Sequence, residues 1–244
     1  MISRKNRIID SHVLLGTENH LSLEVLELLD RMNASQVDIA IARPVGTELV
    51  VENTRGNNRL LEAGSRVKAM VSVNPWYAEK AIEELRRCHD LGAVGLFLQP
   101  ARQGFFPTEQ IADPIISAAA GLDWPIMFHT GTFVYSDILA VAELARRYPE
   151  TNFIAGFGGF SDMWFELPGI FSEIENLFLD ISLIWGDAIS QIVSGVGADR
   201  VLFASAEPRN HYSAVFKCLD RLDLTVEQRS LILGENARRV FKLE

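Results

Sequence analysis

Eight short apolar runs, rich in Val, Ile, Leu and Phe, recur along the chain and constrain its fold more than any other feature. Most of them are nearly continuous rather than alternating, which is typical of parallel strands buried on both faces of a sheet. The sequence therefore predicts eight strands, over Arg7 to Leu15, Val37 to Ala42, Val67 to Val73, Ala93 to Leu98, Pro125 to His129, Asn152 to Ala155, Leu177 to Ile181 and Arg200 to Ser205.

Segments with helical periodicity separate these runs, so strand and helix alternate. They cover Leu21 to Met32, Ala78 to Leu91, Thr108 to Gly121, Asp137 to Tyr148 and Asp187 to Val196, followed by a final amphipathic helix from Val226 to Phe241. This order favours an α/β fold, a (β/α)8 TIM barrel with a C-terminal helix, as a single domain over residues 1–244. A doubly wound sheet is disfavoured because the glycine-rich loop at Gly156 to Gly159 lacks both the dinucleotide spacing and the Lys of a P-loop.

Composition excludes several classes of function. The formal net charge is −9 and Lys and Arg form no large cluster, which argues against nucleic-acid binding. No apolar run is long enough to cross a bilayer and the first ten residues lack an apolar signal region, so we expect no membrane association and a cytoplasmic location. A small-molecule ligand is the expected partner. Aromatic residues in the predicted loops suit either a ligand cavity or a dimer surface, so a homo-oligomer stays open.

Polar residues stand where several predicted strands end, and in a barrel the active site lies at those ends. The motifs are, in chain order, Asp10-Ser11-His12, Gly92 to Leu96 with Pro100, Pro125 to Gly131, Asn152 to Ala155, Asn176 to Asp180, Asp199 to Phe203 with Ser205 and Pro208, and Ile232 to Ala237. Over essentially the whole length they resemble the amidohydrolase superfamily, in its amidohydrolase-related (type 2) branch. The resemblance implies a hydrolase, lactonase or decarboxylase that acts on carboxylated or cyclic small molecules.

The same resemblance implies a divalent metal, but three of the ligand positions hold residues that cannot bind one. The second histidine of the first-strand pattern is replaced by Leu14, and the sixth-strand histidine by Gly156. The strand-eight aspartate, which in this family also takes a proton from the attacking water, is replaced by Ala206.

In strand four, Gln99 stands where histidine is frequent, and Phe97 where Lys or Arg is common. Only the ligands at His12 and His129 survive, whereas a catalytic ion needs about three protein ligands. We therefore expect no cofactor, and a residual zinc ion held weakly by these two histidines is the alternative.

The candidate catalytic residues are His12, His129 and Gln99. The two histidines are expected to face one another across the pocket, as substrate contact or proton carrier, as a hydrogen-bonded structural pair, or as the residual metal pair. Gln99 would orient a carbonyl. Candidate substrate-binding residues, on the same strand ends and loops, are Asp10, Arg102, Tyr135, Trp164, Glu207, Arg209 and His211.

Some of these substrate contacts have a chemical rationale. The guanidinium groups of Arg102 and Arg209 suit a substrate carboxylate because of their paired donors. Glu207 is expected to be a solvated loop carboxylate, since it neighbours Ala206 and adjacent strand residues point to opposite sides. His211 lies on the loop after the last strand, either over the pocket or as the residue that begins a helix.

Two functions are compatible with these residues. The first is an amidohydrolase-like small-molecule hydrolase or lyase that acts on a lactone, amide or carboxylate with a depleted, weak or absent metal site. The alternative is a non-catalytic ligand-binding or scaffold member of the same family, so the sequence leaves open whether the chain is an enzyme. A nucleotide-dependent enzyme is disfavoured, because the loops after the last two strands carry the acidic residues Asp187 and Glu207.

Overall fold

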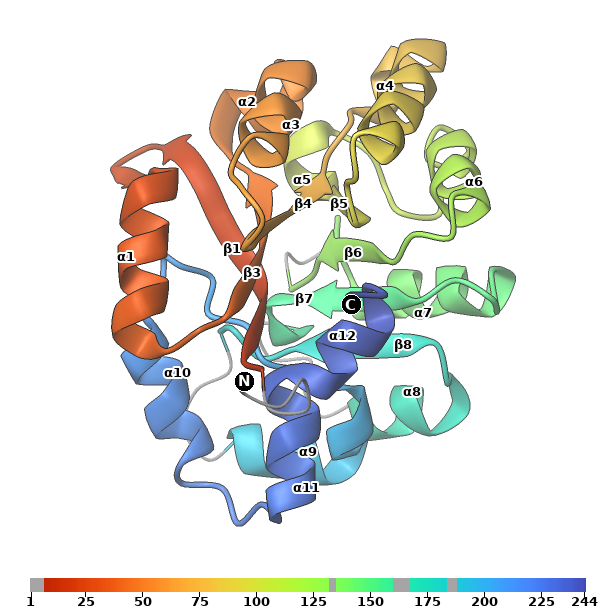
Figure 1. Ribbon diagram of the computed structural model, residues 1–244. Helices are drawn as coiled ribbons and strands as arrows, with labels where there is room; N and C mark the ends of the chain where they lie inside the picture. Colours follow the sequence, from red (N-terminus) through yellow and green to blue (C-terminus); the bar gives the residue numbers. More distant parts are fainter. Residues whose placement is uncertain (1–6, 132–134, 160–166, 184–187) are drawn as a thin grey trace.

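A curled sheet of nine strands forms the centre of the molecule (Figure 1). The computed structural model describes residues 7–131, 135–159, 167–183 and 188–244. The strands follow the order β2-β1-β3-β4-β5-β6-β7-β8-β9, and all neighbours are parallel except β1 and β2. Their bounds are β1 (Ile9–Glu18), β2 (Leu21–Leu23), β3 (Ile39–Pro44), β4 (Val67–Val71), β5 (Gly95–Leu98), β6 (Ile126–His129), β7 (Phe153–Gly156), β8 (Leu177–Asp180) and β9 (Val201–Leu202).

Each of the eight predicted apolar runs overlaps one parallel strand, so the predicted number and order of parallel strands are confirmed, although β1, β3 and β7 extend beyond their runs to Glu18, Pro44 and Gly156. The predicted helix from Leu21 to Met32 is wrong at its start, where β2 pairs antiparallel with the end of β1. Asn19 adopts a left-handed backbone with φ of 53°, which turns the chain back so that Leu23 lies opposite Gly16. The helical pattern therefore begins only after this turn.

Helices surround the strands on the outside of the curled sheet (Figure 1). Their bounds are α1 (Val25–Ser35), α2 (Gly46–Val50), α3 (Asn53–Leu61), α4 (Glu79–Asp90), α5 (Pro100–Gln103), α6 (Asp113–Gly121), α7 (Ile138–Arg147), α8 (Leu167–Glu173), α9 (Ala188–Val196), α10 (Tyr212–Leu219), α11 (Val226–Ser230) and α12 (Asn236–Val240). A π-helical turn, η6 (Leu231–Glu235), joins α11 to α12, and short 3-10 turns lie at η2 (Pro75–Tyr77), η3 (Phe157–Gly159) and η5 (Ala198–Arg200).

The inner face of the sheet is packed with apolar side chains. We call this set the inner cluster; it contains Ile9, Ile39, Ile41, Leu49, Met70, Phe97, Met127, Ile154, Phe178, Leu202, Ala237, Val240 and Phe241. Its last three members come from α12 and the residue after it, and α12 lies in front of the strands in Figure 1. A ligand site must therefore lie toward the opposite end, where the parallel strands finish.

Backbone hydrogen bonds bring the segment after β9 against β1. Ser11 N donates to Phe203 O at 2.9 Å, Ala206 N to His12 O at 2.9 Å and Leu14 N to Glu207 O at 2.8 Å. The carboxyl ends of the first and last parallel strands are thus neighbours in space.

Ile154 on β7 is fully buried in the inner cluster. We expect Ile154→Ala to lower the free energy of unfolding by about 2–5 kcal/mol, because it removes buried methyl groups and leaves a cavity. Leu26 on α1 is 78% exposed, so the control Leu26→Ala should change this free energy by less than about 0.5 kcal/mol. Urea unfolding measures both, and equal losses would contradict the assignment of Ile154 to the core.

Candidate functional site

Four polar side chains lie near one another on four parallel strands, three of them at or near the end of a strand and His12 in the first half of β1. His12 lies on β1, Arg43 near the end of β3, His129 at the end of β6 and Asp180 at the end of β8. Parallel strands finish at the same edge of a sheet, which is why residues so far apart in sequence become neighbours. His12, Arg43 and Asp180 are buried, with exposed fractions of 0%, 1% and 0%.

His12 is hydrogen-bonded on both ring nitrogens. Its Nδ1 lies 2.6 Å from Asp180 Oδ2, and Arg43 Nε donates to its Nε2 at 3.1 Å. A guanidinium has only donors, so Nε2 must be the unprotonated acceptor and Nδ1 must carry the proton given to Asp180. Burial, opposed by Asp180 and assisted by Arg43 and Arg209, lowers the pKa of His12 below its usual value. His12 is therefore a neutral imidazole with one defined tautomer.

Asp180 is held as an ionised carboxylate although it is buried. Burial by itself would raise its pKa, but the interaction with His12 and the hydrogen bond from Ser182 bring the pKa below the usual value. Ser182 N donates to Oδ1 at 2.6 Å, and Phe157 N donates to Oδ2 at 3.1 Å. These donors fix the carboxylate and, through it, the ring of His12.

Arg43 places a buried positive charge beside His12. Its Cζ lies 4.3 Å from the centre of the Phe97 ring, and its Nη1 donates to Pro44 O at 3.1 Å. Burial lowers the pKa of Arg43 to about 9, with Glu18 acting in the opposite direction, so the side chain is charged at neutral pH. Sequence reasoning missed Arg43, although a charged residue directly after the buried run Ile39 to Ala42 is a signal of a strand-end site.

His129 and His12 pack against the same aromatic ring. The Phe157 ring lies 4.5 Å from the centre of the His129 ring and 4.6 Å from that of His12. The buried Nδ1 atom of His129 has no hydrogen-bond partner among the residues that the structure describes. Burial, and next the charge of Arg43, lower the pKa of His129 to about 3, so this imidazole is neutral near pH 7.

Two loop arginines share one carboxylate beside these residues. Arg102, on α5, and Arg209, after β9, both pair with Glu18 at the end of β1, and Arg209 Nη2 lies 3.3 Å from Glu18 Oε2. Glu18 is 7% exposed, whereas the two arginine side chains are 38% and 36% exposed. The structure thus brings the two predicted cations together on the edge of the site.

Glu207 is not the solvated carboxylate that the sequence predicted. It is only 2% exposed, pairs with Arg31 of α1 and accepts the backbone N–H of Tyr212 at 3.2 Å. The alternation rule fails because the chain has already left β9, which ends at Leu202. His211 has 67% of its side chain exposed, lies 3.4 Å from Glu207 and is the residue before α10 begins.

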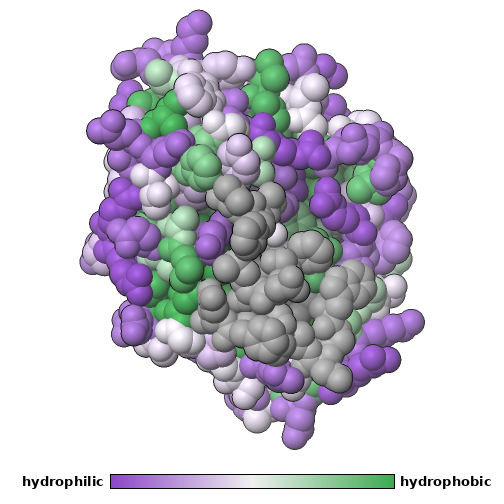
Figure 2. Space-filling view, turned by 180° about the vertical axis from the view of Figure 1, so that it is seen from behind, coloured by the Kyte–Doolittle hydropathy of each residue, from purple (hydrophilic) through white to green (hydrophobic). Residues whose placement is uncertain are grey.

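The remaining predicted residues lie at different depths. Gln99 is 8% exposed and immediately precedes α5, where its backbone N–H donates to Gln103 Oε1. Tyr135 is 41% exposed and stacks on Phe106, with ring centres 4.9 Å apart. Trp164 lies outside the described residues. Seen from the side opposite α12, hydrophilic residues cover most of the outer border of this face, and hydrophobic residues form separate, smaller patches (Figure 2).

Asp10 is a buried structural acceptor rather than an open side chain. It is 0% exposed, and its Oδ1 accepts Ser205 N at 3.0 Å and His12 N at 3.1 Å, while its Oδ2 contacts Ser205 Oγ. Burial raises the pKa of Asp10 to about 7, although these hydrogen bonds oppose the shift. Asp10 therefore ties β1 to the segment after β9.

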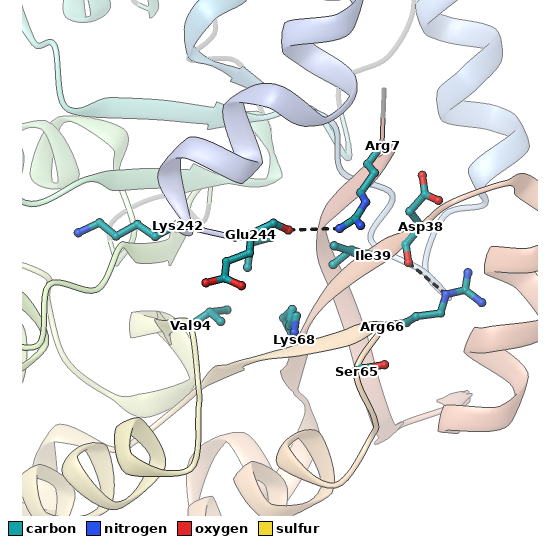
Figure 3. Close-up of a pocket in the computed structure, with 10 residues that line it drawn as sticks. Arg7, Asp38, Ile39, Ser65, Arg66, Lys68, Val94, Lys242 and Glu244 are labelled. Atoms are coloured by element: carbon teal, nitrogen blue, oxygen red, sulfur yellow. Dashed lines mark hydrogen bonds between the residues drawn. The ribbon is translucent and has the colours of Figure 1, made fainter. Parts of the chain in front are cut away.

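A cavity of about 610 Å³ lies at the other end of the sheet, between the strand starts and the C-terminus (Figure 3). Its walls include Arg7, Arg66, Lys68 and Lys242. Arg7 donates to Glu244 O, Arg66 to Asp38 O, and Lys242 pairs with Asp123. Because three of these four basic side chains are engaged within the chain, we place the candidate site at the His12 end.

The family model described as Amidohydrolase matches residues 27–243 of the chain. The chain belongs to the amidohydrolase family. The resemblance inferred from the strand-end motifs is thereby confirmed. Comparison with the curated proteins gives no significant match.

Several solved structures share the fold of this amidohydrolase. The 5-carboxyvanillate decarboxylase from Sphingomonas paucimobilis is 14% identical, with 98% of this chain and 99% of that chain covered and a TM-score of 0.78. A dihydroxybenzoic acid decarboxylase from Polaromonas sp. JS666, with bound manganese and 2-nitroresorcinol, is 17% identical, with 98% and 97% covered and a TM-score of 0.81. A probable 2-pyrone-4,6-dicarboxylic acid hydrolase from Acinetobacter baumannii, with citric acid bound, is 13% identical, with 97% and 99% covered and a TM-score of 0.74.

The positions that the sequence resemblance predicts for further metal ligands are apolar or lack a side chain. Leu14 and Ala206 are buried in one cluster with Val45 and Phe157. At Gly156 an added Cβ would lie 2.9 Å from Phe128 O, so a side chain there would require the neighbouring strand to shift. Within the described ranges, no group of three or more His, Cys, Asp or Glu side chains is placed to hold a metal ion.

Two non-glycine residues of this apolar cluster have left-handed backbones. Phe157 has φ of 65° and Ala206 has φ of 56°. Their N–H groups donate to Asp180 Oδ2 and to His12 O, respectively.

No helix in the described part of the amidohydrolase is both long and apolar enough to cross a membrane.

The raised pKa of Asp10 predicts a specific pH dependence of stability. Well below pH 4, Asp10 is protonated in both the folded and the unfolded chain. As the pH rises from about 4 to 7, the unfolded chain ionises first, so this contribution to stability is lost. The side chain of Asp10→Asn cannot ionise, so this variant does not lose that part of its free energy of unfolding as the pH rises. We expect the wild type to lose stability relative to Asp10→Asn over this range, as measured by urea unfolding at several pH values. A difference that stays constant would contradict the raised pKa.

Proposed function

We propose that this amidohydrolase is a small-molecule hydrolase or lyase that acts on a lactone, amide or carboxylate without a divalent metal. Family membership and the solved relatives, which include carboxylate decarboxylases and a hydrolase by name, support this class of reaction. The observation that carries the proposal is the chain of contacts Asp180–His12–Arg43 beside the unpartnered Nδ1 of His129. Such preorganised donors and acceptors are the elements of acid–base catalysis.

We assign the two histidines different roles. Because His12 Nε2 already accepts a hydrogen bond from Arg43, His12 orients that guanidinium rather than moving a substrate proton. His129 is neutral, and its buried Nδ1 has no partner among the described residues, so we assign His129 as the group that exchanges a proton with the substrate. Arg43 stabilises negative charge that develops on the reacting oxygen.

The described residues do not fit a divalent ion held by three side chains. His12 Nε2 is occupied by Arg43, Leu14 and Ala206 offer no donor atom, and Gly156 has no room for one. Manganese is named in the Polaromonas structure, whose chain is 17% identical. A residual zinc ion on His12 and His129 would first require Arg43 to leave His12. The proposed chemistry therefore uses side chains alone.

We also infer that the curled sheet is a closed (β/α)8 barrel within one domain over residues 1–244. The backbone bonds of Ser11, Leu14 and Ala206 across β1 and the segment after β9 support closure. The antiparallel β2 then lies outside the eight-stranded ring, as an extension of β1.

The experiment is a turnover assay of the full chain on lactones, amides and aromatic carboxylates, in the presence and absence of EDTA. We expect His129→Ala to lower kcat by about 100-fold or more, because it removes the proton-exchanging group. His89→Ala, on α4 with 44% of its side chain exposed, is the matched control and should leave kcat unchanged. EDTA should have no effect.

The alternative is a non-catalytic ligand-binding protein of the same family, and the apolar cluster at Leu14 and Ala206 favours it. Ligand-dependent thermal shifts without any product would support that alternative. Turnover that is unaffected by His129→Ala would contradict the role given to His129, and turnover lost with EDTA would contradict the metal-free reaction.

A further inference from the structure

The pairing of His12 with Asp180 has the form found at metal centres. A histidine that binds a metal through one nitrogen usually donates its other N–H to a carboxylate, which fixes the ring and its tautomer. Here Nδ1 meets Asp180 at 2.6 Å, but the nitrogen that would face a metal accepts from Arg43 at 3.1 Å.

We propose that Arg43 is the resident cation of this site: its guanidinium takes the position on His12 Nε2 that a divalent ion would need, and its free end binds an anionic oxygen of the ligand, such as a carboxylate. This inference concerns the same site as the proposed function and rests on it for the presence of a ligand. Arg43 is then the residue that decides both which cation the site holds and which charge of ligand it accepts.

Arg43 is held firmly enough to act as a fixed charge. Its exposed fraction is 1%, its guanidinium lies over Phe97, and its Nε and Nη1 are used by His12 and Pro44. A guanidinium carries five N–H donors in a planar fork. In the described part of the chain the hydrogen bonds of Arg43 leave Nη2 for a ligand, and the Nδ1 atom of His129, whose pKa the charge of Arg43 helps to lower, also lacks a partner there.

The charges around Arg43 favour an anion. Among the described residues, those that act on its charge are the carboxylates of Glu18 and Asp180 and the guanidinium groups of Arg102 and Arg209. Asp180 is committed to His12, while Glu18 is shared by the two loop arginines. A ligand carboxylate can therefore replace Glu18 as the partner of an exposed arginine and also reach Arg43, with the paired geometry that guanidinium groups favour.

The same arrangement disfavours a divalent ion. An ion at His12 would lie beside a buried like charge, and the apolar side chains of Leu14 and Ala206 offer no compensating ligand. The absence of the usual metal ligands and the presence of Arg43 thus belong together: the site holds a guanidinium in place of a divalent ion.

The first test follows the His12 ring in the full chain by ¹⁵N NMR of labelled histidine. We expect the wild type to show a neutral ring protonated on Nδ1, with an Nε2 signal that one equivalent of Zn²⁺ does not move. Arg43→Met should shift the Nε2 signal, because it loses its donor, whereas Arg146→Met, with a side chain that is 51% exposed on α7, should not. Zn²⁺ that shifts Nε2 in the wild type would overturn the proposal, and this measurement needs no variant to fold.

The second test measures anion binding by calorimetry, with acetate as the probe and acetamide as its neutral control. We expect acetate to bind the wild type more tightly than acetamide, and about tenfold or more weakly to Arg43→Met. Arg43→Lys, which restores charge without the planar fork, should lie between the two. Equal affinities for acetate and acetamide, or an acetate affinity unchanged in Arg43→Met, would overturn the anion-binding role.

These outcomes are independent of catalysis. If the turnover assay fails but His12 ignores Zn²⁺ and Arg43 controls acetate binding, the resident-cation proposal stands and the catalytic one falls. If turnover requires His129 but Zn²⁺ binds His12, the catalytic role of His129 stands and the resident-cation proposal falls.

Discussion

The buried chain of contacts from Asp180 through His12 to Arg43 is the interaction on which the strand-end region depends. A carboxylate and a guanidinium in a dry interior are costly unless each is paired and hydrogen-bonded. Here the imidazole joins them, and the ring nitrogens are satisfied by one donor and one acceptor. Because β1, β3 and β8 each supply one member, the same contacts that define the site also hold three strand ends in register.

The apolar surroundings make these contacts stronger. Phe97 covers one side of Arg43, and Phe157 packs against His12 and His129. A low local dielectric strengthens each charge-assisted hydrogen bond and makes the loss of a partner more costly. In the site, each buried charge of Asp180 and Arg43 therefore has a hydrogen-bond partner in the imidazole of His12. The cavity near the C-terminus differs, because its charged groups line a wider opening (Figure 3).

The sequence predicted the parts of the fold that depend on local pattern. Continuous apolar runs marked all eight parallel strands, and the predicted helix from Asp137 to Tyr148 begins where expected, since Asp137 caps α7 by accepting Leu139 N at 2.9 Å. The strand β2 could not be predicted, because three residues carry too little periodicity and their pairing depends on the turn at Asn19.

The site was predictable only in part. The strand-end motifs identified His12 and His129, and placed Asp180 within a family motif without a role. The contact of Arg43 with His12 depends on two strands far apart in sequence, so no local pattern reveals it. The burial of Glu207 depends on Arg31 of α1, a long-range pair of the same kind.

The left-handed backbones of Phe157 and Ala206 couple the loops to this chain of contacts. A non-glycine residue in that region costs about 1–3 kcal/mol and persists only where its surroundings hold it. Phe157 is held by Asp180 and Ala206 by the carbonyl of His12, so the loops after β7 and β9 take their shape from the same two residues. An event that displaces Asp180 together with the backbone of His12 would therefore release conformational strain in the loops after β7 and β9 at once, which couples two loops on the same part of the entrance.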